Sequence, residues 1–109
     1  MCRNFFYKFV KISSMYLLEL DAMFTCTSMK YCANHKTQQA IRKHKSELQR
    51  MCVDDLSCKA IEYFEGKGIV EGRGNLCTST SFLTTTGEIF GHSEACAISR
   101  SKYSHFKLV

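Results

Sequence analysis

The chain has 109 residues, seven cysteines and a formal net charge of +5, from 15 Lys and Arg against 10 Asp and Glu. This length suits one domain, and so small a domain buries only part of its unfolded surface, so its core needs a further brace. No segment reaches the roughly 18 to 20 uninterrupted apolar residues that a membrane-spanning helix requires, so we expect no membrane span. Seven cysteines in a short chain are typical of an oxidised extracellular scaffold.

The N-terminal segment, residues 1–30, differs from the rest of the chain. Basic residues precede a short apolar patch at residues 15–18, which acidic residues then interrupt. The basic start suits a secretory signal, but Leu20 is larger than the small residue expected before a cleavage after Ala22. We therefore expect a degenerate signal peptide or a loosely packed helix here, and an incorrectly joined N-terminus is a third reading.

The segment SELQRMCVDD, which starts at Ser46, predicts a short helix. Ser46 followed three residues later by Gln49 matches a capping box, and the apolar side chains that follow share one face at helical spacing. We expect the helix to run from about residue 46 to residue 53. The helix-favouring segment TQQAIRKHK before it would also permit a start at Thr37.

Later segments predict strands. CKAIEYFEG is rich in aromatic and β-branched residues and places Ile61 and Tyr63 on one face. GKGIVEGRGN has four glycines and predicts a flexible hairpin or loop. LCTSTSFLTTTGEIF favours a strand through its threonines, and ACAIS can form one last strand.

The cysteine spacing disfavours a zinc site. Cys26 to Cys32 and Cys52 to Cys58 each enclose five residues, whereas cysteine ligands of zinc are usually separated by two to four. Two histidines lie near enough in sequence to add nitrogen ligands, but a lone histidine in a polar stretch is more often a surface residue. We expect no metal site.

Other kinds of catalytic or cofactor site lack their sequence patterns. No C-x-x-C redox pair is present, and the glycines of GKGIVEG are spaced one residue too far apart for a dinucleotide fingerprint. Nothing in the sequence ties His92 or His105 to a nucleophile. We therefore expect no enzymatic activity and no cofactor.

The spacing around an acidic turn suits a disulfide between Cys52 and Cys58. A helix ending at the first cysteine and a strand starting at the second would bring the two sulfurs together across a tight reversal. A closed loop this short contributes about 2 kcal/mol in the chain-entropy model. For the other cysteines spacing does not choose a connectivity, since six paired cysteines allow fifteen and the odd count leaves one over.

Four segments of the chain resemble the PAN/apple module of extracellular proteins: CANHK, ELQRMCVDDLSCKAIEYFEG, NLCTSTS and EACAIS. The resemblance covers residues 31 to about 100. It implies an α+β domain over residues 31–109, in which a small disulfide-stabilised antiparallel sheet of about five strands cradles one short α-helix. Its most specific part is a helix–turn–strand segment with these residues: Cys52, Asp54, Asp55, Cys58, Ala60, Tyr63 and Phe64.

The resemblance also implies a disulfide pattern. Carried over by position, Cys52 pairs with Cys58, and Cys32 pairs with Cys96. The family usually has a second helical cysteine one turn before Cys52, where this chain has Leu48. That departure leaves the following cysteines unpaired or with an uncertain partner: Cys77, Cys26 and Cys2.

The function implied by the resemblance is non-catalytic recognition of a protein or carbohydrate by a secreted or extracellular module. The alternative is an intracellular small Cys-rich orphan or zinc-binding protein with reduced thiols. An acidic protein or a sulfated glycan would complement the basic residues, and no nucleic acid is expected. A plain solvated face is the competing reading of those charges. The ligand-binding candidates lie ahead of the helix and in the glycine-rich loop: Arg42, Lys43, Lys45, Lys67 and Arg73.

Overall fold

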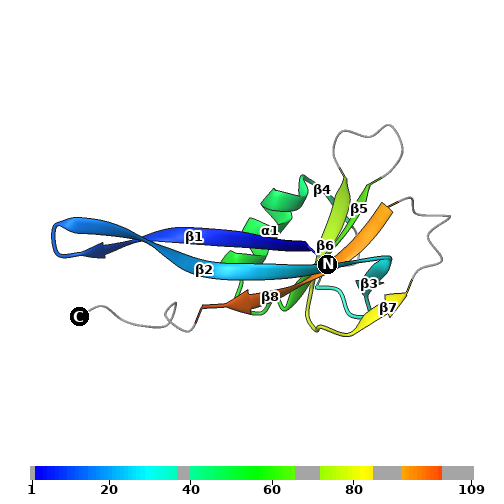
Figure 1. The fold of residues 1–109 in the computed structure, drawn as a ribbon. Helices are drawn as coiled ribbons and strands as arrows, with labels where there is room; N and C mark the ends of the chain where they lie inside the picture. Colours follow the sequence, from blue (N-terminus) through cyan, green and yellow to red (C-terminus); the bar gives the residue numbers. More distant parts are fainter. Residues whose placement is uncertain (1, 37–39, 66–71, 85–91, 102–109) are drawn as a thin grey trace.

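The computed structural model describes residues 2–36, 40–65, 72–84 and 92–101, which form a mostly antiparallel α+β fold with one helix (Figure 1). Within these residues the main sheet has six strands in the order β1-β2-β8-β5-β6-β4, and β3 and β7 form a second sheet. The elements are β1 (Cys2–Ile12), β2 (Met15–Ser28), β3 (Lys30–Cys32), β4 (Ile41–Arg42), α1 (Lys45–Asp54), β5 (Ala60–Glu65), β6 (Arg73–Cys77), β7 (Phe82–Thr84) and β8 (His92–Arg100).

Strand β8 lies in the middle of the main sheet and joins its two halves. On one side it pairs antiparallel with β2, from Ala22↔Arg100 to Ser28↔Glu94. On the other side it pairs antiparallel with β5 along the whole of that strand. The last strand of the chain is therefore hydrogen-bonded to one of the first and to one from the middle, so the sheet depends on contacts that are distant in sequence.

Each face of the sheet carries its own apolar cluster, because side chains alternate between the faces of a strand. On one face Phe24 and Ile61, both fully buried, pack with Leu48 of α1. On the other face Ala60 packs with Phe82 of β7, Cys32 of β3 and Cys77 at the end of β6. The helix thus covers one face and the β3–β7 pair covers the other. No helix in the described part of the chain has the length and apolarity to cross a membrane.

The N-terminal segment is a long β-hairpin, and its base belongs to the core. Ala22 and Phe24 of β2 are fully buried, and the ring of Phe6 on β1 meets Phe24 edge-on at a centroid distance of 5.4 Å. The expectation of a loosely packed helix is therefore wrong for these residues. AMFTC, residues 22–26, buries every second side chain, which is the period of a strand. The signal-peptide reading stays a prediction.

The helix lies where the sequence predicted it, but its first turn differs. It begins at Lys45 after His44, which takes the N-cap position that we assigned to Ser46. The backbone N–H of His44 donates to the Glu47 carboxylate at 3.4 Å. Gln49, the expected partner in the capping box, is instead buried. The capping box of the helix is therefore formed by His44 and Glu47, not by Ser46 and Gln49.

The strand expected from CKAIEYFEG is confirmed as β5, and Ile61 and Tyr63 are both buried on its helix-covered face. The threonine-rich segment contributes β7, and its end, residues 85–91, lies outside the described residues. Most of the expected glycine-rich loop, residues 66–71, also lies outside them. The last expected strand is confirmed within β8.

Replacement of Phe24 by Ala tests whether the N-terminal hairpin belongs to the core. The substitution removes a fully buried ring, so we expect it to lower the free energy of unfolding by about 3 to 5 kcal/mol. Urea unfolding followed by circular dichroism measures the change. Leu56→Ala, at a side chain that is 69 % exposed, is the control and should change stability by less than about 0.5 kcal/mol. Equal small effects for both variants would show that β2 is dispensable.

Candidate functional site

Three disulfides join cysteines of the described residues, and each one anchors a different part of the fold. Cys52–Cys58 ties the end of α1 to the segment before β5, with a Cα separation of 5.3 Å. This bond confirms the prediction from the acidic turn. The other two bonds link β3 to the end of β6 and β2 to β8.

The predicted pairing of Cys32 with Cys96 is wrong. Cys96 of β8 lies opposite Cys26 of β2 in the sheet register, and their Cα atoms are 4.0 Å apart, so these two cysteines form the bond. Cys32 pairs instead with Cys77, at a Cα separation of 6.2 Å. Neither Cys26 nor Cys77 is therefore unpaired. The error follows from leaving residues 1–30 outside the domain, which removed the true partner of Cys96. Cys2 lies opposite Cys26 in the β1–β2 register. That it is unpaired or has an uncertain disulfide partner remains a prediction.

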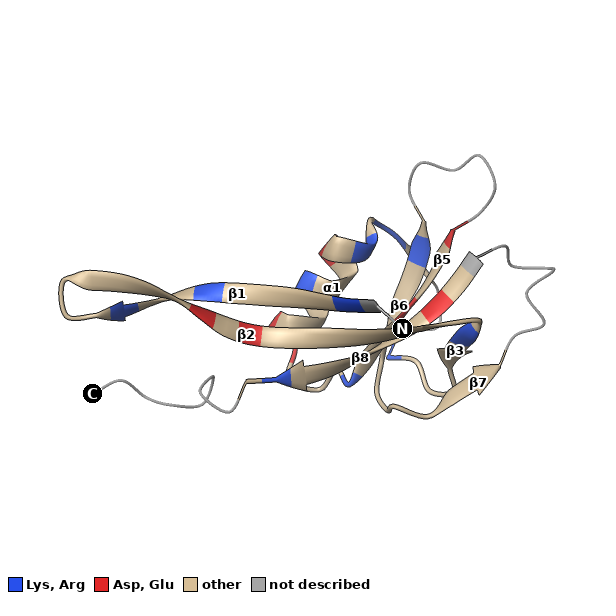
Figure 2. Cartoon of the chain, viewed as in Figure 1, with Lys and Arg blue, Asp and Glu red and all other residues tan. Residues whose placement is uncertain are grey.

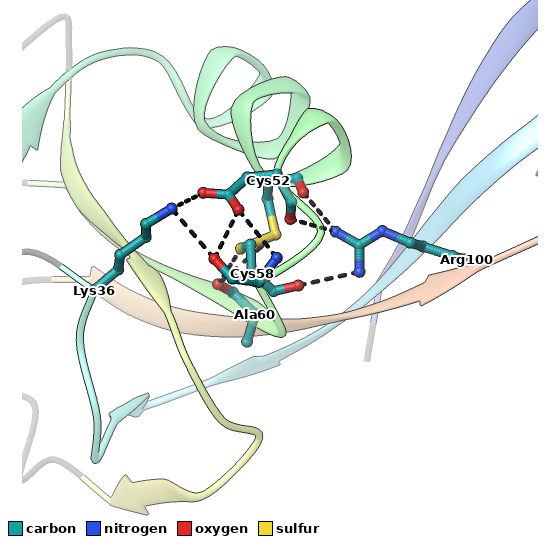
Figure 3. Close-up of polar contacts among 7 residues, drawn as sticks. Lys36, Cys52, Cys58, Ala60 and Arg100 are labelled. Atoms are coloured by element: carbon teal, nitrogen blue, oxygen red, sulfur yellow. Dashed lines mark hydrogen bonds and ion pairs between the residues drawn. A yellow bond between two sulfur atoms is a disulfide. The ribbon is translucent and has the colours of Figure 1, made fainter.

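The guanidinium of Arg100, at the end of β8, closes the Cys52–Cys58 corner (Figure 3). Its Nη2 donates to the carbonyl oxygens of Cys52 and Asp55, both at 2.7 Å, and its Nη1 donates to the carbonyl oxygen of Cys58 at 3.1 Å. The last carbonyls of a helix have no partner within the helix and carry its negative dipole end, so a cation here is favourable. Arg100 is therefore a structural residue that joins helix, turn and sheet.

The Asp55 carboxylate holds the turn of the same corner. It forms an ion pair with Lys36, and it accepts hydrogen bonds from the hydroxyl of Ser57 at 2.7 Å and from its backbone N–H at 3.0 Å. The bond from Lys36 is the largest cause that lowers the pKa of Asp55 to about 2, followed by the two bonds from Ser57. The carboxylate stays charged and serves to fix the loop.

Glu62 is a carboxylate inside the protein, with 1 % of its surface exposed. It accepts hydrogen bonds from the backbone N–H of Cys32 at 2.9 Å and from Nδ2 of Asn75 at 3.0 Å, and its Oε1 contacts Nε2 of His35. A buried charge is tolerated only when it is paired and hydrogen-bonded in this way. All of these partners belong to the protein, so Glu62 holds the end of β3 and the segment after it on the sheet.

The structure brings two of the predicted ligand residues together. Arg42 of β4 lies opposite Arg73 of β6 in the antiparallel register, and both residues are exposed. Figure 2 colours the Lys and Arg positions of the chain blue, including a position on β6. No ion pair of either arginine is found within the described residues. Lys43, in contrast, pairs with Glu47 at 3.7 Å.

The remaining two candidates stand apart from the arginines. Lys45 forms an ion pair with Glu94 of β8, so its charge is used within the fold. Lys67 lies outside the described residues. The basic candidates thus reduce to an arginine pair at the edge of the sheet, which we call the arginine edge, formed by Arg42 and Arg73.

One group of potential metal ligands occurs among the described residues. One ligand atom from each of Cys26, Glu94 and Cys96 lies within 4.8 Å of the others, and all three residues are buried. The two sulfurs are joined as a disulfide and the carboxylate pairs with Lys45. Only a chain in which this disulfide is reduced could therefore offer the group to a metal ion, since thiolates are the ligands.

Comparison with protein-family models, with curated proteins and with solved structures finds no match to this chain. The functional argument therefore depends on the geometry of the molecule. The disulfide corner and the Glu62 cluster are held by contacts within the protein, whereas the arginine edge leaves two exposed cations side by side.

The Asp55 contacts predict a loss of stability in acid. A carboxylate with a lowered pKa stabilises the folded state fully above its unfolded pKa of 3.8, and this contribution is lost as the pH falls towards about 2. Urea unfolding of the wild type and of Asp55→Asn should therefore differ at pH 5 and converge near pH 2. Asp54→Asn, at the exposed neighbouring carboxylate, is the control and should show the smaller difference at pH 5. A constant gap between wild type and Asp55→Asn over this range would contradict the assignment.

Proposed function

We propose that the chain is a non-catalytic recognition module of the extracellular space that binds an acidic protein or a sulfated glycan at the arginine edge. Three disulfides in 109 residues are compatible with an oxidising compartment. The resemblance of residues 31–100 to the PAN/apple family supports the same class, and membership of that family is part of the proposal. Modules of this kind bind through exposed loops and edges on a rigid scaffold.

The observation that carries the proposal is the juxtaposition of Arg42 and Arg73. Residues directly opposite in an antiparallel pair have Cβ atoms about 4.5 to 5.5 Å apart, and like charges at such positions repel each other. An anion placed between them would relieve that repulsion. Two guanidinium groups also suit sulfate or carboxylate, because each can donate two parallel hydrogen bonds.

The neighbouring cations argue against a plain solvated face at this edge. Lys43 and Lys45 lie one and three residues after Arg42 in the chain, and each is paired with an acidic residue of the fold. The chain therefore neutralises the cations beside the edge and leaves the two arginines without an acidic partner among the described residues. A ligand with closely spaced negative groups is the complement that fits.

A second candidate function, zinc binding by a reduced intracellular chain, has one observation in its favour. Reduction of the Cys26–Cys96 bond would give two thiolates and the Glu94 carboxylate in one buried place. These are three of the four ligands of a structural zinc site. We rank it second, because it requires the loss of a bond that joins two central strands.

Heparin chromatography against salt tests the arginine edge. The double variant Arg42→Ser, Arg73→Ser should elute at clearly lower salt than the wild type, because binding through several cations is screened as salt rises. The control is Lys11→Ser, Lys59→Ser, which removes two exposed cations elsewhere and also lowers the formal net charge from +5 by two. Equal shifts for both variants would mean that retention follows net charge alone. Elution of the wild type at or below physiological salt would also count against the proposal.

A further inference from the structure

The β1–β2 hairpin extends beyond the layers that cover the rest of the sheet (Figure 1). Its two strands stay paired out to Ile12↔Met15, whereas the pairing of β2 with β8 ends at Ala22↔Arg100. Residues 7–20 therefore form a two-stranded arm, and Phe5 lies just before it on the same hairpin. An isolated two-stranded ribbon is only marginally stable in water, so an arm of this length is expected to find a further contact.

The arm exposes an unusual amount of apolar surface. An aromatic side chain offers about 150 to 250 Å², so eight large apolar side chains, each about half exposed or more, present on the order of 800 Å² over the two faces of the hairpin together. The five on the face that carries Phe9 and Leu18 account for about 600 Å² of it. That value lies at the low end of what each partner contributes to a stable protein–protein interface. The exposed fractions run from 45 % to 75 % over the following residues: Phe5, Tyr7, Phe9, Ile12, Met15, Tyr16, Leu17 and Leu18.

The two faces of the arm differ in charge. The register pairs Phe9 with Leu18 and Val10 with Leu17, and residues opposite each other share a face. Lys8 lies opposite Glu19 on the Val10 face and also pairs with Asp21 at 3.7 Å. The other face is apolar between Arg3 and Lys11. We call it the aromatic face, and it consists of Phe5, Tyr7, Phe9, Tyr16 and Leu18.

We infer that the aromatic face packs against the aromatic face of a second copy of this chain, giving a symmetric dimer. A two-fold dimer places the same surface on both subunits, so the surface must complement itself. An apolar face of aromatic and leucine side chains meets that condition, because it has no charge in its centre that would need an opposite charge on the partner. Two sheet faces of this kind pack in an aligned sandwich.

Packing through the face is favoured over pairing through the edge of β1. That strand carries Arg3, Lys8 and Lys11 and no acidic residue, so a second β1 beside it would bring like charges together. Basic residues on an edge strand are a known device against edge-to-edge association. The charges therefore protect the edge, whereas the aromatic face is unprotected.

Insertion of the arm into a lipid bilayer is disfavoured by its backbone. A two-stranded ribbon leaves one row of N–H and C=O groups unpaired on the outer edge of each strand, and hydrocarbon offers these groups no partner. The arm also carries Lys8 and Glu19 within its length. A second protein surface does not impose this cost, since water still reaches both edges of the arm.

Sedimentation velocity of the full chain over a wide concentration range tests the dimer. We expect a reversible dimer for the wild type. Phe9→Ser, Leu18→Ser, which removes one cross-strand pair from the aromatic face, should weaken the dimer by at least about 100-fold in dissociation constant. Met15→Ser, Leu17→Ser removes two exposed side chains from the opposite face and should change the dissociation constant by less than about threefold. Circular dichroism and the count of free thiols verify the fold of each variant.

Several outcomes would overturn the inference. A wild-type chain that stays monomeric at every concentration would do so, and so would equal weakening by the two double variants. Dimerisation that appears only after deletion of residues 102–109 would show that this chain's own C-terminal segment occupies the aromatic face. Co-sedimentation of monomeric protein with anionic lipid vesicles, abolished by Phe9→Ser, Leu18→Ser, would assign the face to a membrane surface.

Discussion

The disulfide between Cys26 and Cys96 joins β2 to β8, and the rest of the structure depends on the position of β8. This disulfide joins two cysteines that are 70 positions apart in the sequence. Closing a loop of that length stabilises the fold by about 4 kcal/mol in the chain-entropy model. A domain of this size has a total stability of only about 5 to 15 kcal/mol. Because β8 also pairs with β5, the bond holds the N-terminal hairpin and the middle of the chain in one sheet. The other two disulfides attach the helix and the second sheet to this frame.

Polar contacts complete the frame where disulfides do not reach. Arg100 closes the helix end from the last residue of β8, and Glu62 holds the end of β3 from the middle of β5. Both groups act between elements that are far apart in sequence, and both form hydrogen bonds with protein atoms. Nε of Arg100 is buried without a hydrogen-bond partner among the described residues. The two surfaces that we propose for recognition lie at opposite ends of the sheet. One is the arginine edge on β4 and β6, and the other is the arm formed by β1 and β2.

The local parts of this fold could be predicted from the sequence, whereas the parts that depend on contacts distant in sequence were not predicted. The helix, strand β5 and the Cys52–Cys58 bond each depend on residues within one short segment, where capping, periodicity and spacing carry the signal. The Cys26–Cys96 bond depends on the register between the first and last strands, which no local pattern encodes.

The candidate site shows the same division. The basic residues near the helix were identified from composition, but their separation into ion-paired lysines and an exposed arginine pair follows from the pairing of β4 with β6 and from the position of Glu94 on β8. The hairpin was overlooked because its apolar residues suggested a signal or a helix. The alternation at residues 22–26 is one of burial in the folded chain, whereas the residue types there, AMFTC, do not alternate between apolar and polar. The roles of Arg100 and Glu62 depend on backbone groups that only the folded chain brings near.

Disulfide mapping of the oxidised protein tests the central claim most directly. The chain should be secreted from eukaryotic cells, alkylated without reduction, digested and analysed by mass spectrometry. The account predicts linked peptides that contain Cys26 with Cys96, Cys32 with Cys77, and Cys52 with Cys58. A peptide that links Cys32 to Cys96, or a folded chain whose cysteines are all alkylated and which retains zinc, would contradict it.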